Sequence, residues 1–365
     1  MICTSVRSIS GLTTAVGTWG VVTSLVVKSY DETPYSQNTI FFSTGGTSNI
    51  STEVFWAGVK AYHAFVPRIV DRGGQGSNYL SNGFDFFNNG TKSVTFQNSI
   101  WMPEMSAAEL DTFTEPLIRN LAAVGVHIPK PVSALIPNYG ASREQGPTNG
   151  GAGSGILASR LFPRENFEDE GLLDATMDAI RNYIEAGYSF HSNNYAPTLD
   201  VVKNVDNAVS PHLRRAVSHA TGFNTGGFGP QTEEQVKASY DIWNSYIQQW
   251  RDVSPTAGCY MNEANVMEPN WQWAFFGENY PRLMRIKKQW DPWGLFYATT
   301  AVGSEEWEVR NPGPLKTQDG RLCRLATPSS SWSEPDVGDW KKKVKSSDAL
   351  KPAKVVRPAP IRRAL

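Results

Sequence analysis

The spacing of apolar residues along the chain predicts amphipathic helices that alternate with strand-like runs. Phe55, Val59, Tyr62 and Val66 recur at helical spacing, and the proline that follows, Pro67, is expected to end this helix. Residues 17–28 (GTWGVVTSLVVK) and 93–102 (SVTFQNSIWM) have the β-branched and aromatic composition of strands. The pattern therefore predicts an α+β fold in which helices pack on a sheet.

Two further helices begin with capping-box signatures. Ser106 precedes Glu109 by three residues, and Thr232 precedes Gln235 by the same spacing. Gly125 is expected to end the first of the two helices. The predicted apolar faces are Leu110, Phe113, Leu117, Leu121 and Val124 for the first helix, and Val236, Tyr240, Trp243 and Ile247 for the second.

Charge is distributed unevenly along the chain. The formal net charge is −1, but nine Lys or Arg residues against two Asp follow from Asp339 onward, which leaves the body at about −8. A near-neutral protein gives no reason to expect nucleic acid or a membrane as a partner. We expect a disordered, dispensable basic tail from Ala326, because Lys, Pro and Ser offer too few apolar groups for a core.

Common catalytic signatures are weak in this sequence. The five histidines (His63, His127, His191, His212 and His219) form no HExxH motif and there is no CxxC pair, so no metal site is predicted. A Ser-His-Asp triad stays open, although no GxSxG elbow is present. We expect the histidines to be surface or hydrogen-bonded core residues. Residues 142–155 are predicted to form a flexible glycine-rich loop.

The richest candidate chemistry begins at Cys259, in a stretch dense in aromatic, Asn and Gly residues. Tyr260 and Asn262 are two residues apart, so in a strand the phenol and the amide would share one face. Aromatic and amide groups together suit a flat heterocycle. The alternative for Tyr260 is a buried tyrosine whose hydroxyl only satisfies a neighbouring polar group.

A basic amphipathic helix follows, from Asn279 to Trp290, and Asp291-Pro292 is expected to end it. Leu283, Ile286 and Trp290 are predicted to face inward. On spacing alone, a surface helix that caps an ordinary core is an equally good interpretation.

The ordered motifs from Tyr260 onward resemble the C-terminal signature of the berberine-bridge-enzyme-like FAD-linked oxidoreductases. The opening run Gly17–Val22 resembles the segment that ends the family's FAD-binding domain, and residues 207–211 match a recurrent family stretch. The amino-acid sequence of residues 262–272 is most similar to fungal members. The matching C-terminal residues are Tyr260, Asn262, Phe275, Phe276, Gly277, Asn279, Tyr280, Arg282, Leu283, Ile286, Lys287, Asp291, Pro292 and Phe296.

This resemblance implies the fold of vanillyl-alcohol-oxidase/p-cresol-methylhydroxylase-type enzymes. Residues 1–32 would be a remnant of the FAD-binding domain, and 33–257 a substrate-binding domain with a mainly antiparallel sheet. Residues 258–325 would be the berberine-bridge-like segment that returns to the FAD-binding domain, followed by the basic tail 326–365. The implied cofactor is FAD, and the implied cofactor-binding residues are Gly17, Thr18, Gly20, Val22, Asn262 and Asn279.

The sequence departs from the family at its start. Family members carry a glycine-rich pyrophosphate loop and a flavin-linked histidine before the GTWGVV run, and this sequence carries neither. We therefore expect an N-terminally truncated family member; a truncated gene, a degenerate copy and a misplaced start codon all stay open. Without that half, Val21, Leu25, Phe275 and Phe276 are expected to form an exposed apolar patch.

The resemblance implies hydride transfer from a small organic substrate to FAD, with oxygen as acceptor, in fungal secondary metabolism. Tyr260 would be the catalytic base, which requires positive charge or hydrogen bonds to lower the pKa of a phenol, and Tyr280 is the next candidate. The alternatives are an inactive homologue and a non-redox module that binds a small ligand. The sequence carries no localisation signal, and it leaves the oligomeric state open.

Overall fold

A computed structural model describes most of the chain, and two predicted segments fall largely or wholly outside it. Of the strand predicted over 17–28, only Gly20, Val21, Thr23 and Ser24 are described, in neither strand nor helix. The predicted loop 142–155 lies outside the described residues. The described residues are 20–21, 23–24, 31–45, 50–84, 92–129, 131–137, 156–203, 206–224, 232–263, 265–310, 313–316, 320–329 and 331–345.

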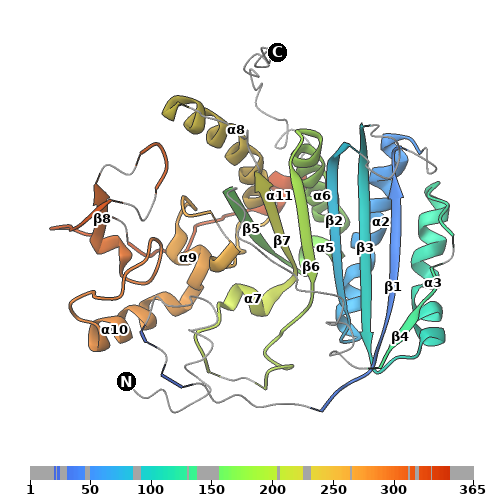
Figure 1. The fold of residues 1–365 in the computed structure, drawn as a ribbon, viewed down its shortest axis with the longest axis horizontal. Coiled ribbons are helices and arrows are strands. Elements are labelled where there is room, and N and C mark those ends of the chain that lie inside the picture. Colours follow the sequence, from blue (N-terminus) through green and yellow to red (C-terminus); the bar gives the residue numbers. More distant parts are fainter. Residues whose placement is uncertain are drawn as a thin grey trace.

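Seven strands form one antiparallel sheet in the order β4-β1-β3-β2-β6-β7-β5 (Figure 1). This arrangement confirms the predicted α+β fold with a mainly antiparallel sheet. The strands are β1 (Tyr35–Ser43), β2 (Gln75–Phe84), β3 (Lys92–Pro103), β4 (Ala134–Ile136), β5 (Ile156–Pro163), β6 (Ser189–Asn194) and β7 (Ala216–Asn224).

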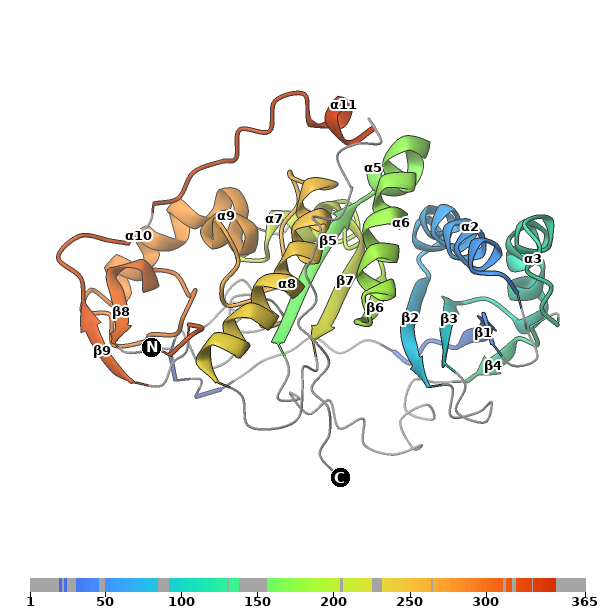
Figure 2. The same ribbon diagram turned by 90° about the horizontal axis from the view of Figure 1, so that it is seen from above.

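Helices cover one face of this sheet, and Figure 2 shows α2, α3 and α6 side by side along it. The apolar stripes of the helices and the inward side chains of the strands form one continuous core. The main covering helices are α2 (Thr52–Asp71), α3 (Ala107–Ala123), α6 (Glu170–Glu185) and α8 (Glu233–Asp252), with the short helix α5 (Glu165–Glu168). The short helix α7 (Pro211–Arg215) directly precedes β7 and contacts β5.

Alternate residues of each strand point to opposite faces. On β3, Phe96 is fully buried against the helices, whereas Gln97 is exposed on the other side. We call these two sides the covered face and the open face. Strand register places Phe42, Phe96, Leu80 and Phe190 side by side on the covered face. It places Phe41, Gln97, Tyr79, His191, Thr221 and Ser159 side by side on the open face.

Both predicted capping boxes are present. The backbone N–H of Ser106 donates to Glu109 Oε2 at 2.8 Å, and the backbone N–H of Glu109 donates back to Ser106 Oγ at 3.3 Å. Thr232 and Gln235 exchange the corresponding bonds at 2.9 and 3.2 Å. These reciprocal bonds satisfy N–H groups that the first helical turn leaves without partners.

The prediction that Pro67 ends its helix is wrong, because α2 continues to Asp71. Pro67 is buried, and the next turn adds Ile69 and Val70 to the core. A proline inside a helix removes one main-chain hydrogen bond. Burial of the additional apolar turn offsets that loss, so the apolar face determines where the helix ends.

Residues 259–329, which we call the C-terminal lobe, have their own small core, and the expected exposed patch is wrong at two positions. Phe275 and Phe276 are only 3% and 5% exposed, because both pack within this lobe. Val21 is exposed, and Leu25 lies outside the described residues. The elements of the lobe are η2 (Met261–Glu263), α9 (Trp271–Phe276), η3 (Gly277–Asn279), α10 (Tyr280–Trp290), η4 (Ser304–Glu306), β8 (Trp307–Arg310) and β9 (Arg321–Arg324).

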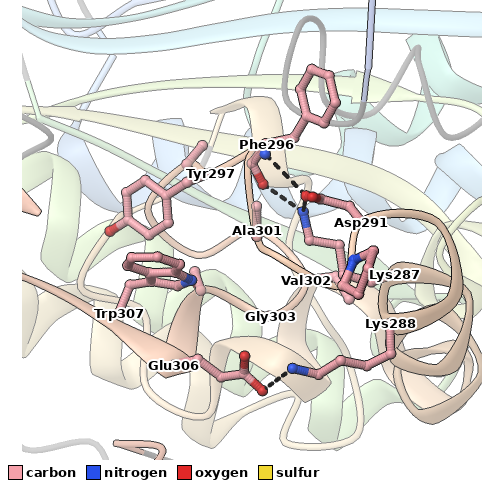
Figure 3. A pocket seen from close by; sticks show the side chains of 14 residues that line it. Lys287, Lys288, Asp291, Phe296, Tyr297, Ala301, Val302, Gly303, Glu306 and Trp307 are labelled. Carbon is pink, nitrogen blue, oxygen red and sulfur yellow. Dashed lines mark hydrogen bonds and ion pairs between the residues drawn. The ribbon is translucent and has the colours of Figure 1, made fainter. Parts of the chain in front are cut away.

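Helix α10 has the predicted extent but not the predicted inward face. Leu283 packs against the lobe core, whereas Ile286 is 43% and Trp290 61% exposed. The helix lies on the surface and only its first turns contribute to packing. Beyond it, Asp291 pairs with Lys287 and accepts the backbone N–H of Phe296 at 3.0 Å, which fixes the turn shown in Figure 3.

Part of the segment expected to be a disordered tail is ordered. Helix α11 (Trp340–Lys345) packs on α6, and Trp340 and Val344 are buried in the main core. Lys341 forms an ion pair with Glu165 beside them. Two apolar side chains at helical spacing are therefore enough to dock this segment, although its composition is strongly basic.

Candidate functional site on the open face

The structure brings Tyr260 and Asn262 together, but not on a strand as predicted. Tyr260 precedes the 3-10 turn η2, and the Asn262 amide donates a hydrogen bond to the Tyr260 hydroxyl at 2.9 Å. Ser159 of β5 holds the backbone of Tyr260: it accepts the backbone N–H at 2.9 Å and donates to the carbonyl at 3.2 Å. A tight turn, and not a shared strand face, therefore brings the phenol and the amide together.

His219 of β7 lies directly beside Tyr260 on the open face. Its ring is 5% exposed and meets the Tyr260 ring edge-to-face, with centroids 5.2 Å apart. His219 Nδ1 shares a hydrogen bond with the Tyr195 hydroxyl at 3.2 Å, and Nε2 lies 3.6 Å from Glu263 Oε2. That separation is longer than a hydrogen bond, and Nε2 has no hydrogen-bond partner among the described residues.

Burial keeps this imidazole neutral. Burial, and to a smaller extent the nearby His191 ring, lowers the pKa of His219 to about 4. His219 therefore supplies no positive charge to Tyr260 near neutral pH. The described hydrogen bond that supports the Tyr260 phenol oxygen comes instead from the Asn262 amide.

Glu263 places a carboxylate at the same site. Thr221 Oγ1 donates to Glu263 Oε2 at 3.3 Å, and the Glu263 side chain is 47% exposed. Sequence reasoning did not select Glu263 or His219, although Glu263 directly follows the Tyr-x-Asn motif. Its partners lie more than 40 residues earlier in the chain, so only the fold reveals the cluster.

An aromatic pair extends the site along the sheet. Tyr79 of β2 and His191 of β6 are register partners, and their rings stack 4.3 Å apart with an 18° angle between planes. Ser77 Oγ shares a hydrogen bond with His191 Nε2 at 3.0 Å. His191 in turn is the register partner of Thr221. We call Tyr79, His191, Thr221, Glu263 and Tyr260 the open-face row.

The other predicted site residues lie elsewhere or are not described. Gly17, Thr18 and Val22 lie outside the described residues, and Gly20 is partly exposed. Asn279 donates to the Val209 carbonyl at 3.0 Å, a bond that ties the start of α10 to the segment before α7. It is not part of the open-face row.

Tyr280, the second candidate base, is unsuited to that role. Its hydroxyl lies 2.6 Å from both carboxylate oxygens of Glu305, and burial beside this negative charge raises the pKa of Tyr280. A base needs the opposite shift. Glu305 and Trp271 line a separate cavity of about 290 Å³ in the C-terminal lobe, away from the open-face row.

The described residues include no group of three or more His, Cys, Asp or Glu side chains that is arranged to hold a metal ion. None of the helices in the same ranges combines the length and the apolar character needed to cross a bilayer.

This combination of a seven-stranded antiparallel sheet, helices on one face and a lobe that returns to the open face is the architecture of VAO-type flavoproteins. A crystal structure of such a flavoprotein from Myceliophthora thermophila matches with a TM-score of 0.66 and 25% identity, over 85% of this chain and 53% of that chain. Berberine bridge enzyme from Eschscholzia californica shares the fold, with a TM-score of 0.52 at 9% identity over 74% of this chain and 55% of that chain.

The sequence comparisons confirm the resemblance to berberine-bridge-like FAD-linked oxidoreductases. The family described as "Berberine and berberine like" matches residues 259–303. An uncharacterized FAD-linked oxidoreductase of Arthroderma benhamiae is 30% identical over 80% of this chain and 50% of its own length, and the FAD-linked oxidoreductase patO of Aspergillus clavatus is 28% identical over 85% and 50%. The chain therefore spans about half the length of the curated relatives it matches.

Two of the described residues carry polar groups of the kind that the ring end of FAD would require. The Asn262 amide and the Tyr260 phenol lie at the edge of the open face, where they can hydrogen-bond a flat heterocycle. The Gly17–Val22 run that resembles the end of an FAD-binding domain lies mainly outside the described residues.

Proposed function

We propose that the protein is an FAD-linked oxidoreductase that oxidises a small organic molecule held against the open face. The observation that carries this proposal is the cluster of Tyr260, His219 and Glu263, which joins the family-matching segment to the sheet. Bound FAD would accept the hydride and oxygen would reoxidise it. The fungal relatives support a role in fungal secondary metabolism, with a small molecule as the partner.

The protein's own residues would position the substrate and take its proton. Tyr260 is the proposed acceptor, because the Asn262 amide donates to its oxygen and would stabilise a phenolate. Glu263 is the competing acceptor, because its half-exposed carboxylate lies beside the same cluster. His219 would position Tyr260 through its ring contact, and it lies beside Glu263.

Anaerobic stopped-flow reduction of flavin-loaded protein tests this assignment. Tyr260→Phe keeps the ring and removes the oxygen, so flavin reduction should slow by about 10²- to 10⁴-fold while flavin content stays constant. Asn262→Ala should instead raise KM or lower flavin occupancy, because a lost hydrogen bond costs about 1–3 kcal/mol of binding.

A Tyr260→Phe variant that reduces its flavin at the parent rate would show that Tyr260 only packs. Glu263→Gln would then be expected to carry the rate loss. If the protein shows no absorbance near about 450 nm after incubation with FAD and removal of the unbound cofactor, an inactive homologue or a non-redox binding module would be favoured.

A further inference from the structure

We propose that the C-terminal lobe binds a small protonated amine in the cavity that Trp271 and Glu305 line. The cavity measures about 290 Å³. Small-molecule sites in proteins begin at about 300 Å³, so the cavity has room for an amine that carries one ring. It lies away from the open-face row, and the inference goes beyond the proposed function and does not depend on it.

Glu305 supplies the anionic group of this cavity. The residue is only 7% exposed. Among the described residues, its carboxylate accepts a hydrogen bond only from the Tyr280 hydroxyl, which lies 2.6 Å from both oxygens and carries a single hydrogen. A carboxylate can accept about four hydrogen bonds, and a buried one is normally paired with a cation. Glu305 therefore keeps acceptor positions for an ammonium group.

Aromatic rings supply the walls of the cavity. Trp271, Tyr297 and Trp307 all line it. Figure 3 shows Tyr297 and Trp307 next to each other, with ring centroids 6.5 Å apart and 60° between the planes. The face of such a ring attracts a cation. The Arg324 guanidinium already lies 5.7 Å from the centre of the Trp307 ring, so this indole accepts a cation within the fold itself.

The turn that follows α10 adds a polar acceptor. Thr299 Oγ1 is shielded from solvent and has no hydrogen-bond partner among the described residues, and Thr299 lines the cavity. The next residue, Thr300, also lines it and has a φ of 64°, which is uncommon for a β-branched residue. Strained backbone of this kind is frequent at ligand sites. The hydroxyl is available to an N–H donor.

The other charged residues of the wall leave Glu305 without a cation. Glu308 pairs with Arg310 at 3.2 Å. Lys316 is exposed, and its ammonium group forms no ion pair with a carboxylate in the described ranges. The attraction for a ligand cation therefore originates from Glu305, whereas Lys316 at the rim would repel it weakly.

Calorimetric titration of the whole 365-residue chain with three one-ring probes tests the inference. Near about pH 7.5, phenethylamine is protonated, 2-phenylethanol is neutral and phenylacetate is an anion. We expect phenethylamine to bind about tenfold more tightly than the alcohol, and phenylacetate to bind most weakly, because only the amine can pair with Glu305. Equal affinity for the alcohol, tighter binding of phenylacetate, or no binding of phenethylamine would each overturn the proposal.

Variants assign the binding to the cavity. Glu305→Gln keeps the size of the side chain and an oxygen that can accept from Tyr280, and it should weaken phenethylamine binding about tenfold and abolish the preference over the alcohol. Trp307→Leu, which leaves the Tyr280–Glu305 bond intact, should weaken it about threefold. Unchanged affinity in either variant, once thermal denaturation shows that it is folded, would overturn the proposal.

Two further variants serve as controls. Glu263→Gln changes a half-exposed carboxylate on the open face and should alter phenethylamine affinity less than twofold. Lys316→Ala should leave the affinity unchanged or raise it, because a like charge is removed. A loss in the Glu263 variant equal to that in the Glu305 variant would place the amine elsewhere, and a loss in the Lys316 variant would show that the cavity binds anions. Either result would overturn the proposal.

Discussion

The covered and open faces of the sheet are made by the same strands, yet they have different tasks. On β3, Phe96 is buried under the helices while its neighbour Gln97 is exposed. On β7, Ala220 is buried in the core whereas His219 reaches the Tyr260 cluster. Because side chains alternate along a strand, stability and recognition are encoded at interleaved positions. The face to which a residue points, and not the element that carries it, decides what its substitution affects.

Polarity alone does not distinguish the two faces. The covered face contains a buried amide network in which Tyr62 donates to Asn194 Oδ1 at 2.8 Å and Asn78 donates to the same oxygen at 3.2 Å. A side chain at Gly76 would collide with the Tyr62 hydroxyl, so only glycine fits there. These amides are inaccessible and serve the fold, whereas the open face carries exposed polar groups, such as Gln97, beside buried ones, such as Thr221.

The largest effect should come from the covered face. Phe96→Ala removes a fully buried ring and leaves a cavity, so the free energy of unfolding should fall by about 3–5 kcal/mol. Gln97→Ala, one residue along, should change it by less than about 0.5 kcal/mol. Urea denaturation of the two variants measures the contrast, and similar losses would mean that the faces are not energetically distinct.

Helix α11 should contribute to the covered side almost as strongly. Trp340→Ala should lower the free energy of unfolding by about 2–4 kcal/mol, because the indole packs in the main core at 8% exposure. Lys342→Ala is the control, since that side chain is 82% exposed. A Trp340 variant as stable as the parent would restore the earlier expectation of a dispensable tail.

A pH effect of intermediate size should also originate on the covered side. Burial lowers the pKa of His63 from 6.5 to about 4, so the unfolded chain takes up this proton first. Stability is therefore complete above about pH 6.5 and is lost as the pH falls toward 4, by about 1–3 kcal/mol for this residue. His63→Phe keeps the stack on Phe167 and should flatten that fall, as urea denaturation from pH 7 to 4.5 would show.

The smallest effect is expected on the open face. Thr39 and Ser99 share an exposed hydrogen bond of 3.3 Å across β1 and β3. Ser99→Ala should change the free energy of unfolding by less than about 0.5 kcal/mol, because water replaces the lost partner. A loss above about 1 kcal/mol in the same urea assay would show that the open face also stabilises the sheet.

Short-range sequence motifs correctly predicted where two helices begin. The caps at Ser106 and Thr232 need only residues three positions apart, and both are present. The α10 region shows the limit. Spacing gave its extent correctly, but Ile286 and Trp290 face solvent because the lobe core ends before them. Periodicity identifies an apolar stripe and does not say whether another element covers it.

The candidate site was predictable only in part. Tyr260 and Asn262 are neighbours in sequence, so their meeting could be expected even though the turn that joins them was not. His219 and Glu263 meet through sheet register and through the return of the C-terminal lobe. Register follows from the whole hydrophobic pattern of a sheet, so a single strand such as β7, which is buried along almost its whole length, does not reveal its neighbours.

The C-terminal lobe is connected to the sheet domain on both sides, because α11, which follows the lobe, also packs on that domain. The lobe begins where the Leu161 N–H donates to the Gly258 carbonyl, and the chain ends its described course with Trp340 in the main core. A protease cut in the connection between β8 and β9 should therefore leave two fragments that migrate together in native chromatography. They should separate only under denaturing conditions, because the N-terminal fragment contains the sheet domain and the C-terminal fragment keeps Trp340 of α11 in its core.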